Sequence, residues 1–282
     1  MTIKEALALG RKSLIALPSP FLDTRLILEH VMAADYSYLI THDEESMSPD
    51  QEHQYLVLLD RAAAGEPIPY LTGRTQFYGL ALIVSPAVLI PRPETEHLVE
   101  LALDWIRVDY RLAAPPHIVD VGTGSGCIAL ALASQLPEAR IEATDVSEAA
   151  LEIAKENART LGYNNRIDFH LGSFLEPIHG EPNLIAANLP YIADHEWSTV
   201  SSGVKSHEPD IALRGGSDGL DSIRQLLIQA AKRLASGGAL FLEIGWHQGN
   251  TASSLSQSTF PHAQVKVMKD YAGHDRIICV YT

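Results

Sequence analysis

Four consecutive residues, Asn188-Leu189-Pro190-Tyr191, carry the side chains best suited to chemistry in this sequence. The Asn carboxamide both accepts and donates hydrogen bonds, and the proline restrains the residue before it toward an extended backbone. The tyrosine offers a flat ring and a hydroxyl. Together the four residues could hold a planar NH2 group, with two acceptors for its hydrogens and a ring to stack on. The alternative is a turn that ends a strand, a common use of Asn and Pro.

A glycine-rich loop is the second candidate for chemistry. The apolar run at residues 117–121 leads into Gly122-Thr123-Gly124-Ser125-Gly126, and a helix is predicted at residues 127–136. Glycines at such a strand-to-helix turn let a ligand approach the backbone, and the helix N-terminus adds unsatisfied N–H groups. The pattern therefore predicts a nucleotide-type cofactor site.

The spacing of the glycines indicates which cofactor is excluded. The dinucleotide motif requires Gly or Ala at its sixth place, which here is Cys127, and glycine falls at the fifth place instead. Asp120 stands in the mouth of the turn, where its negative charge would repel a pyrophosphate. The negative charge of Asp120 would instead attract a cationic amine.

Two more strands are predicted to end in residues that would complete such a site. The strand at 140–144 ends at Asp145, where an acid can accept hydrogen bonds from ribose hydroxyls. The strand at 167–171 leads to Phe174, which could stack on an adenine or fill the core. Because ligands of parallel sheets bind at the carboxyl ends of the strands, we expect these residues to share one cleft with Asn188.

A stiff loop precedes these strands. Segments with β pattern, interpreted as a hairpin between two domains, lie at residues 76–78, 81–84 and 88–90. Pro91-Arg92-Pro93 then opens a helix, and two prolines that close together restrict its entry. This loop could bring Arg92 to the wall of a substrate cleft, or it could be a plain linker.

The N-terminal part reads as helical. Three amphipathic helices are predicted, near residues 3–15, 22–32 and 49–65, and two of them begin with capping-box spacing at Thr2 and at Ser48. No residue set there suggests chemistry, so we interpret this part as a packing or docking unit.

The C-terminal half continues the alternation of strands and helices. A polar stretch at 193–217 is long for a structureless loop, which predicts a lid or a substrate-facing loop. The last two strands, at 264–268 and 276–281, have no helix between them and should pair antiparallel.

The predicted fold is therefore α/β, a seven-stranded, mostly parallel, doubly wound sheet with one reversed strand. A small helical domain and a β-hairpin linker precede it, and the expected boundaries are 1–75, 76–92 and 93–282.

Composition narrows the possible partners. The 282 residues carry a formal net charge of −14, which argues against an extended grip on nucleic acid. Two cysteines in apolar segments and twelve scattered His predict neither a disulfide nor a metal site. The sequence has no apolar run long enough to span a membrane and no secretory pattern at its start. We expect a cytoplasmic monomer.

Residues 120–126, Asp145 and the reversed last strand resemble the class I S-adenosylmethionine-dependent methyltransferases. The sequence more closely resembles the protein-(glutamine-N5) methyltransferases that modify bacterial peptide chain release factors. The segments that carry this resemblance, in the family's order, are Gly65-Glu66-Pro67-Ile68, Tyr70-Leu71-Thr72-Gly73, Phe77-Tyr78-Gly79-Leu80, residues 89–96, residues 188–192, Glu208-Pro209 and residues 270–276.

The resemblance implies S-adenosyl-L-methionine as cofactor, S-adenosyl-L-homocysteine as product and release factors as protein substrate. It implies that the ribose lies on Asp145, the adenine near Phe174 and the methionyl amine toward Asp120. The cofactor site as a whole would comprise Asp120, Gly122, Thr123, Gly124, Ser125, Gly126, Asp145, Phe174 and Asn188. The substrate amide would donate to the side chain of Asn188 and the carbonyl of Leu189 and stack on Tyr191, and Pro190 and Arg92 would complete the substrate site.

Leu189 departs from the family pattern, which is usually Asn-Pro-Pro-Tyr. The expected acceptor is the backbone carbonyl, which any residue provides, and Pro190 still restrains the backbone before it. Asn-Leu-Pro-Tyr also occurs in enzymes that resemble ribosomal RNA adenine dimethylases. The alternatives are therefore an N6-adenine methyltransferase acting on RNA or DNA and a glutamine methyltransferase acting on a ribosomal protein. The acidic charge favours a protein substrate.

Overall fold

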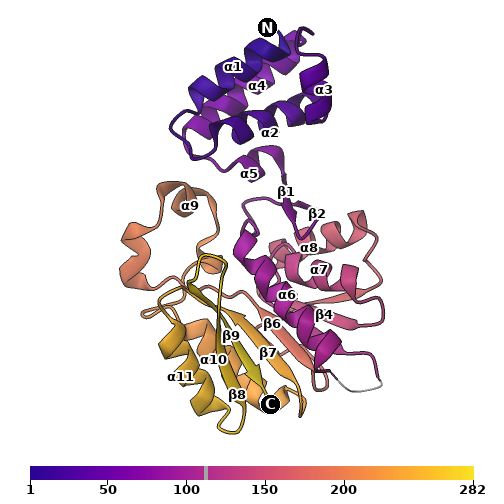
Figure 1. Cartoon of the computed structure of the whole chain (residues 1–282), viewed down its shortest axis with the longest axis vertical. Helices are drawn as coiled ribbons and strands as arrows, with labels where there is room; N and C mark the ends of the chain where they lie inside the picture. Colours follow the sequence, from indigo (N-terminus) through magenta and orange to yellow (C-terminus); the bar gives the residue numbers. More distant parts are fainter. Residues whose placement is uncertain (111–113) are drawn as a thin grey trace. The chain divides into compact units, whose positions relative to one another are not determined.

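The structure, a computed structural model, describes residues 1–110 and 114–282. The chain forms two compact units (Figure 1). Residues 1–74 and 201–207 make up the first unit, and residues 75–200 and 208–282 make up the second. A short segment from the C-terminal half therefore belongs to the helical N-terminal unit.

The first unit is helical. Its helices are α1 (Ile3–Ser13), α2 (Pro20–Met32), α3 (Tyr36–Thr41), α4 (Pro49–Ala63), α5 (Ile68–Thr72) and α9 (Ser202–His207). Capping boxes begin α1 at Thr2 and α4 at Ser48, as the spacing predicts. Helices α3 and α5 are not predicted from the sequence, because helices of 6 and 5 residues are too short to show a helical period.

The core of the first unit is closed around Tyr55. This side chain is fully buried, and its hydroxyl donates to the carbonyl of Ala6 at 2.8 Å, so its polar end is satisfied inside the core. Gly10 of α1 lies against it, and a Cβ at this position would stand 2.2 Å from the tyrosine oxygen. The glycine thus lets α1 approach α4 closely.

The second unit is built on a seven-stranded sheet of order β5-β4-β3-β6-β7-β9-β8. The strands are β3 (His117–Val121), β4 (Arg140–Asp145), β5 (Ile167–Leu171), β6 (Leu184–Ala187), β7 (Ala239–Glu243), β8 (Gln264–Lys269) and β9 (Asp275–Tyr281). All neighbours from β5 to β7 are parallel, whereas β9 runs antiparallel to both β7 and β8. The predicted fold class, with one reversed strand, is confirmed.

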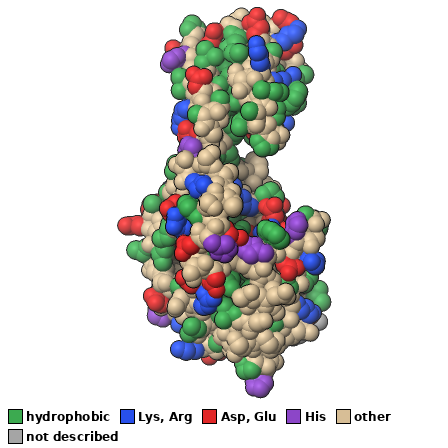
Figure 2. Space-filling view, turned by 90° about the vertical axis from the view of Figure 1, so that its left-hand side faces the viewer, with side chains coloured by type: hydrophobic (Ala, Val, Ile, Leu, Met, Phe, Trp, Pro, Cys, Tyr) green, Lys and Arg blue, Asp and Glu red, His purple; other side chains and the backbone are tan. Residues whose placement is uncertain are grey.

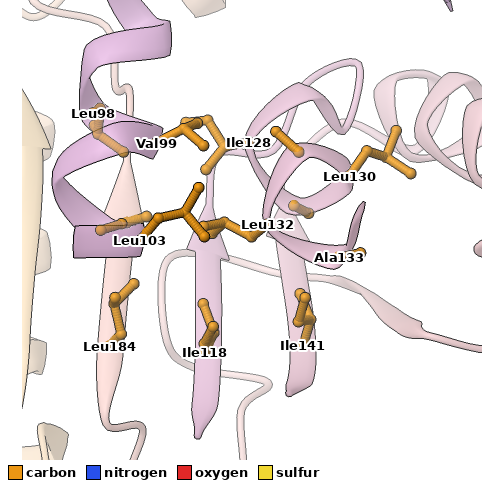
Figure 3. Close-up of a cluster of buried hydrophobic side chains, with 14 of the residues drawn as sticks. Leu98, Val99, Leu103, Ile118, Ile128, Leu130, Leu132, Ala133, Ile141 and Leu184 are labelled. Carbon is orange, nitrogen blue, oxygen red and sulfur yellow. The ribbon is translucent and has the colours of Figure 1, made fainter. Parts of the chain in front are cut away.

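Helices cover both faces of this sheet. One face carries α6 (Pro93–Val108), α7 (Cys127–Gln135) and α8 (Glu148–Thr160), and the other carries α10 (Asp221–Arg233) and α11 (Gly249–Thr259). Figure 3 shows the first face, where Leu103 of α6 and Leu132 of α7 point toward Leu184, Ile118 and Ile141 on three neighbouring strands. Strands buried on both faces explain the continuous apolar runs in the sequence.

The hairpin differs in part from the prediction. β1 (Arg74–Phe77) and β2 (Leu80–Ile83) form a two-stranded sheet, and Tyr78 and Gly79 both have positive φ, 50° and 75°, as a tight hairpin turn requires. Residues 88–90 are not a strand. The N–H of Ile90 donates to the carboxylate of Glu208 at 3.3 Å rather than to a neighbouring strand.

The polar stretch at 193–217 is largely ordered. It contains two 3-10 segments, η1 (Asp194–Thr199) and η2 (Asp210–Ala212), on either side of α9. Within residues 1–110 and 114–282, no helix has the length and apolar character needed to cross a membrane.

Candidate active site

A cavity opens at the carboxyl edge of the sheet, and all of its walls belong to the second unit. Residues after β3, β4, β5 and β6 contribute to it, as expected for a parallel sheet. The predicted site residues that line it are Arg92, Gly122, Thr123, Gly124, Ser125, Asp145, Phe174, Asn188, Leu189 and Pro190. Three other predicted site residues, Asp120, Gly126 and Tyr191, do not line the cavity itself.

The glycine loop presents its backbone to this cavity. Gly122 and Gly124 have φ of 72° and 55°, a conformation that side-chain-bearing residues seldom adopt. The N–H of Gly124 donates to Oδ2 of Asp145 at 2.9 Å, and Oδ1 of the same carboxylate accepts from the N–H of Ser147. Asp145 therefore fixes the loop and keeps further lone pairs at a partly exposed position.

Asp120 lies beneath the loop and is fully buried. Its Oδ2 accepts from the Thr123 hydroxyl at 2.6 Å and from the Ala129 N–H at 3.1 Å. Its Oδ1 has no hydrogen-bond partner within the described parts of the chain. Burial raises the pKa of Asp120 to about 7, although the two hydrogen bonds act in the opposite direction. A positively charged amine above the loop would stabilise the ionised form of this carboxylate, whose Oδ1 is buried and unpartnered.

Phe174 holds an unusual backbone conformation, with φ of 51°. Such a conformation costs a bulky residue free energy and persists only when its surroundings fix it. The Thr144 hydroxyl does so by donating to the Phe174 carbonyl at 2.8 Å. Phe174 lines the cavity and also packs against the core. Its position is therefore compatible both with stacking on an adenine and with filling the core.

The tetrapeptide after β6 is held from several sides. Nδ2 of Asn188 donates to the Thr95 hydroxyl at 3.0 Å, and the Leu189 side chain is buried next to Gly122, where a Cβ would come within 2.9 Å of it. The Tyr191 carbonyl accepts from Gln248 at 2.9 Å. Asn188 is therefore a held side chain at the cavity wall, which a simple strand-ending turn does not require.

The proline-arginine loop forms one wall of the cavity. Arg92 lines the cavity and its guanidinium donates to Oε1 of Glu208. The Glu208 side chain is almost completely buried and also accepts from the N–H of Ile90. A buried carboxylate with two donors fixes this loop, so Arg92 is more than part of a flexible linker.

Three residues at the site were not predicted from the sequence. Thr95 lines the cavity, and Glu243 at the end of β7 accepts from the Thr95 and Tyr191 hydroxyls. Gln248 holds the Tyr191 carbonyl. Glu243 carried a usable signal, because an acid that ends a buried apolar strand lies at the ligand-binding edge. Gln248 carried no such signal, since it donates to the backbone carbonyl of Tyr191, which is distant in sequence.

The sheet order, the reversed β9 and the glycine loop after the first strand of the sheet define a class I methyltransferase. A solved structure of a methyltransferase from Pyrococcus furiosus shares this fold, with a TM-score of 0.54 at 17% identity over 83% of this chain and 98% of that one. The 16S rRNA N2 G1207 methyltransferase of T. thermophilus, solved with AdoMet and guanosine, has a TM-score of 0.51 at 16% identity and covers 74% of this chain and 49% of that one.

Sequence relatives define the family. The family description "PrmC N-terminal domain" matches residues 5–73, and "Methyltransferase small domain" matches residues 109–204. The release factor glutamine methyltransferase of Moorella thermoacetica is 41% identical over 284 residues, which cover 100% of this chain and 99% of the relative. The chain belongs to the release factor glutamine methyltransferase family, and the family resemblance found in the sequence is confirmed.

Proposed function

We propose that this methyltransferase transfers a methyl group from S-adenosyl-L-methionine to the side-chain amide nitrogen of a glutamine in a peptide chain release factor, leaving S-adenosyl-L-homocysteine. One observation carries the proposal. The bond from Asn188 Nδ2 to Thr95 leaves Oδ1, which has no partner in the described chain, at the cavity wall. The adjacent Leu189 carbonyl likewise has no donor there. Two neighbouring acceptors suit the two hydrogens of a primary amide.

The residues around the glycine loop fit the cofactor. Asp145 would accept from the ribose hydroxyls, Phe174 would cover the adenine, and the unpartnered oxygen of Asp120 would favour the methionyl ammonium. Gly122 and Gly124 would allow close approach of the backbone. When bound, the cofactor supplies a methyl group activated by its sulfonium.

The tetrapeptide would prepare the acceptor nitrogen. An amide nitrogen is a poor nucleophile, because its lone pair is delocalised into the carbonyl. Acceptors at Asn188 and Leu189 would draw positive character onto its two hydrogens and fix the nitrogen in one orientation. The Tyr191 ring would stack on the amide plane. We expect proton loss to solvent after transfer.

Charge and domain organisation support a protein partner. On the face shown in Figure 2, Lys and Arg side chains are interspersed with Asp and Glu rather than gathered into a basic surface. The net charge of −14 acts in the same direction. We propose that residues 1–75 recognise the release factor away from the modified glutamine, that residues 93–282 carry catalysis, and that the enzyme acts as a monomer without direct contact to nucleic acid.

A competition experiment tests the proposed substrate. The enzyme is incubated with radiolabelled S-adenosylmethionine and a mixture of release factor, ribosomes and bulk RNA or DNA. Label in the release factor supports the proposal. Label in nucleic acid would establish the adenine methyltransferase alternative. Label in a ribosomal protein would establish a glutamine methyltransferase that acts on the ribosome.

A further inference from the structure

A buried chain of hydrogen bonds runs from the tetrapeptide to the end of β7. Asn188 Nδ2 donates to the Thr95 hydroxyl at 3.0 Å, and this hydroxyl donates to Oε2 of Glu243 at 2.7 Å. Thr95 and Glu243 are each 1% exposed, so solvent does not compete for these bonds. We propose that Glu243, acting through Thr95, is a positioning residue that sets which end of the Asn188 side-chain amide faces the substrate. This inference rests on the proposed function.

The direction of each bond follows from the donors available. A threonine hydroxyl has one hydrogen to donate. While Glu243 is ionised, it accepts that hydrogen, so the threonine oxygen can only accept from the NH2 of Asn188. The amide oxygen of Asn188 is then turned toward the cavity, where a substrate NH2 group needs an acceptor.

Protonation of Glu243 reverses this order. A protonated carboxyl can donate to the Thr95 oxygen, and the threonine hydrogen then needs another acceptor. The oxygen of Asn188 satisfies it if the amide turns over, which places the Asn188 NH2 toward the substrate. Two NH2 groups would then face each other without an acceptor, and the substrate nitrogen would lose one of its two anchors.

The surroundings of Glu243 allow both states near neutral pH. Burial raises its pKa to about 7, although the Thr95 hydroxyl, Arg276 of β9 and the Tyr191 hydroxyl act to lower it. Glu94 of α6 raises it further, and Cys127 of α7 is kept neutral because burial raises the pKa of its thiol. At saturating S-adenosylmethionine, kcat should therefore rise with pH as Glu243 ionises, with a midpoint near 7.

Thr95→Val tests the chain of bonds with little change of volume. We expect kcat for a glutamine peptide to fall about tenfold, the equivalent of one lost hydrogen bond. The pH step near 7 should disappear with cofactor affinity unchanged. Thr95→Ser, which keeps the hydroxyl, should restore both rate and pH step. Thr24→Val is the matched control, because Thr24 is fully buried in the helical unit and its hydroxyl has no partner among the described residues.

Glu243→Gln removes the titration of residue 243 and keeps the size of the side chain, so the step in kcat near pH 7 should be absent at saturating S-adenosylmethionine. Asp120, whose pKa burial also raises to about 7, would act on cofactor affinity, which is measured separately. A spectroscopic readout separates this proposal from the proposed function. In the 15N spectrum of the free protein, the side-chain NH2 signal of Asn188, assigned by its loss in Asn188→Ala, should shift with a midpoint near pH 7 in wild type and not in Glu243→Gln.

Specific outcomes would overturn the inference. The first is a kcat in Thr95→Val equal to that of the wild type. The second is a loss of kcat in Thr95→Val that does not recover in Thr95→Ser. The third is an Asn188 side-chain NH2 signal that does not shift with pH. If release factor is not methylated at all while the Asn188 signal still titrates, the proposed substrate is wrong and the positioning chain stands.

Discussion

The N–H of Gly124 donates to the carboxylate of Asp145 at 2.9 Å, joining the glycine loop after β3 to the end of β4. The acid thus has two tasks in one cavity. It holds the loop in the conformation that exposes its backbone, and we propose that its remaining lone pairs accept from a ligand. Removal of the Asp145 charge should therefore weaken ligand binding in two ways, by loosening the glycine loop and by removing acceptors for the ligand.

Asp145→Ala is expected to weaken S-adenosylmethionine binding by about tenfold or more, because hydrogen bonds to charged groups contribute roughly 1.5 to 3 kcal/mol. The fold should remain, since Asp145 is partly exposed at a strand end. Isothermal titration calorimetry measures the affinity. Asp168→Ala, an exposed acid on the neighbouring β5, is the control and should leave affinity unchanged. Equal affinities for the two variants would remove Asp145 from the cofactor site.

Asn188→Ala is expected to lower kcat by about two to three orders of magnitude, as for loss of one preorganised group at a reacting centre. Cofactor affinity should stay largely intact, because the side chain is proposed to orient the acceptor nitrogen. Single-turnover kinetics together with calorimetry separate the two quantities. Near-normal turnover would mean that Asn188 only shapes a turn.

Gly219→Ala is expected to unfold more easily and to lose activity. Gly219 has φ of 78°, and a Cβ there would lie 2.2 Å from the Tyr191 carbonyl oxygen, so the tetrapeptide would have to move. Gly237→Ala is a matched control with φ of 73° and open space around the added Cβ. Both variants carry the cost of the backbone conformation, about 1 to 3 kcal/mol. Gly219→Ala should show a larger fall in melting temperature and in kcat than Gly237→Ala. Equal falls in the two variants would contradict the prediction that the added Cβ displaces the tetrapeptide.

The helical unit is expected to recognise the folded substrate. A glutamine occurs in every protein, so recognition needs a larger surface, on the order of 800 Å² per partner. Ile15 and Phe21 are 73% and 63% exposed on this unit, which suits such a contact. Replacing both by Ser should lower kcat/KM for folded release factor and leave a short glutamine peptide unaffected.

Val108→Ser is the control for this test, because Val108 is 58% exposed at the end of α6 that lies away from the cavity. Surface substitutions are preferable to removal of residues 1–75, since residues 201–207 belong to the helical unit and would lose their packing. An equal loss on peptide and folded protein would mean that the helices only support the catalytic unit.

Much of the fold could be predicted because its signals are local. The strand 117–121 matches β3 to the residue, since a buried strand is a short apolar run between breakers. The strand 167–171 also matches β5 to the residue, although only Ile167 of that strand is buried. The error at 88–90 has a clear cause. These residues have β pattern, but the N–H of Val88 donates to the nearby Ser85 carbonyl, and the N–H of Ile90 donates to Glu208, more than a hundred residues away, which no local pattern reveals.

The site divides in the same way. The glycine loop, Asp145 and Asn188 could be predicted as candidates because each lies at the end of a recognisable strand, and the structure brings them to one cavity. The contacts that hold Asn188 were not found. Thr95 lies 93 residues from it and Glu243 lies 148 residues from Thr95, so their meeting depends on the packing of α6 against the sheet.

The most direct test of the account is to locate the methyl group. Purified release factor is incubated with the enzyme and S-adenosylmethionine, digested, and analysed by tandem mass spectrometry beside a reaction with Asn188→Ala. We expect one added methyl group on the side-chain nitrogen of a single glutamine with wild-type enzyme, and almost none with the variant. A methyl group on another residue type, or equal modification by both enzymes, would contradict the proposal that Asn188 presents a glutamine amide for methylation.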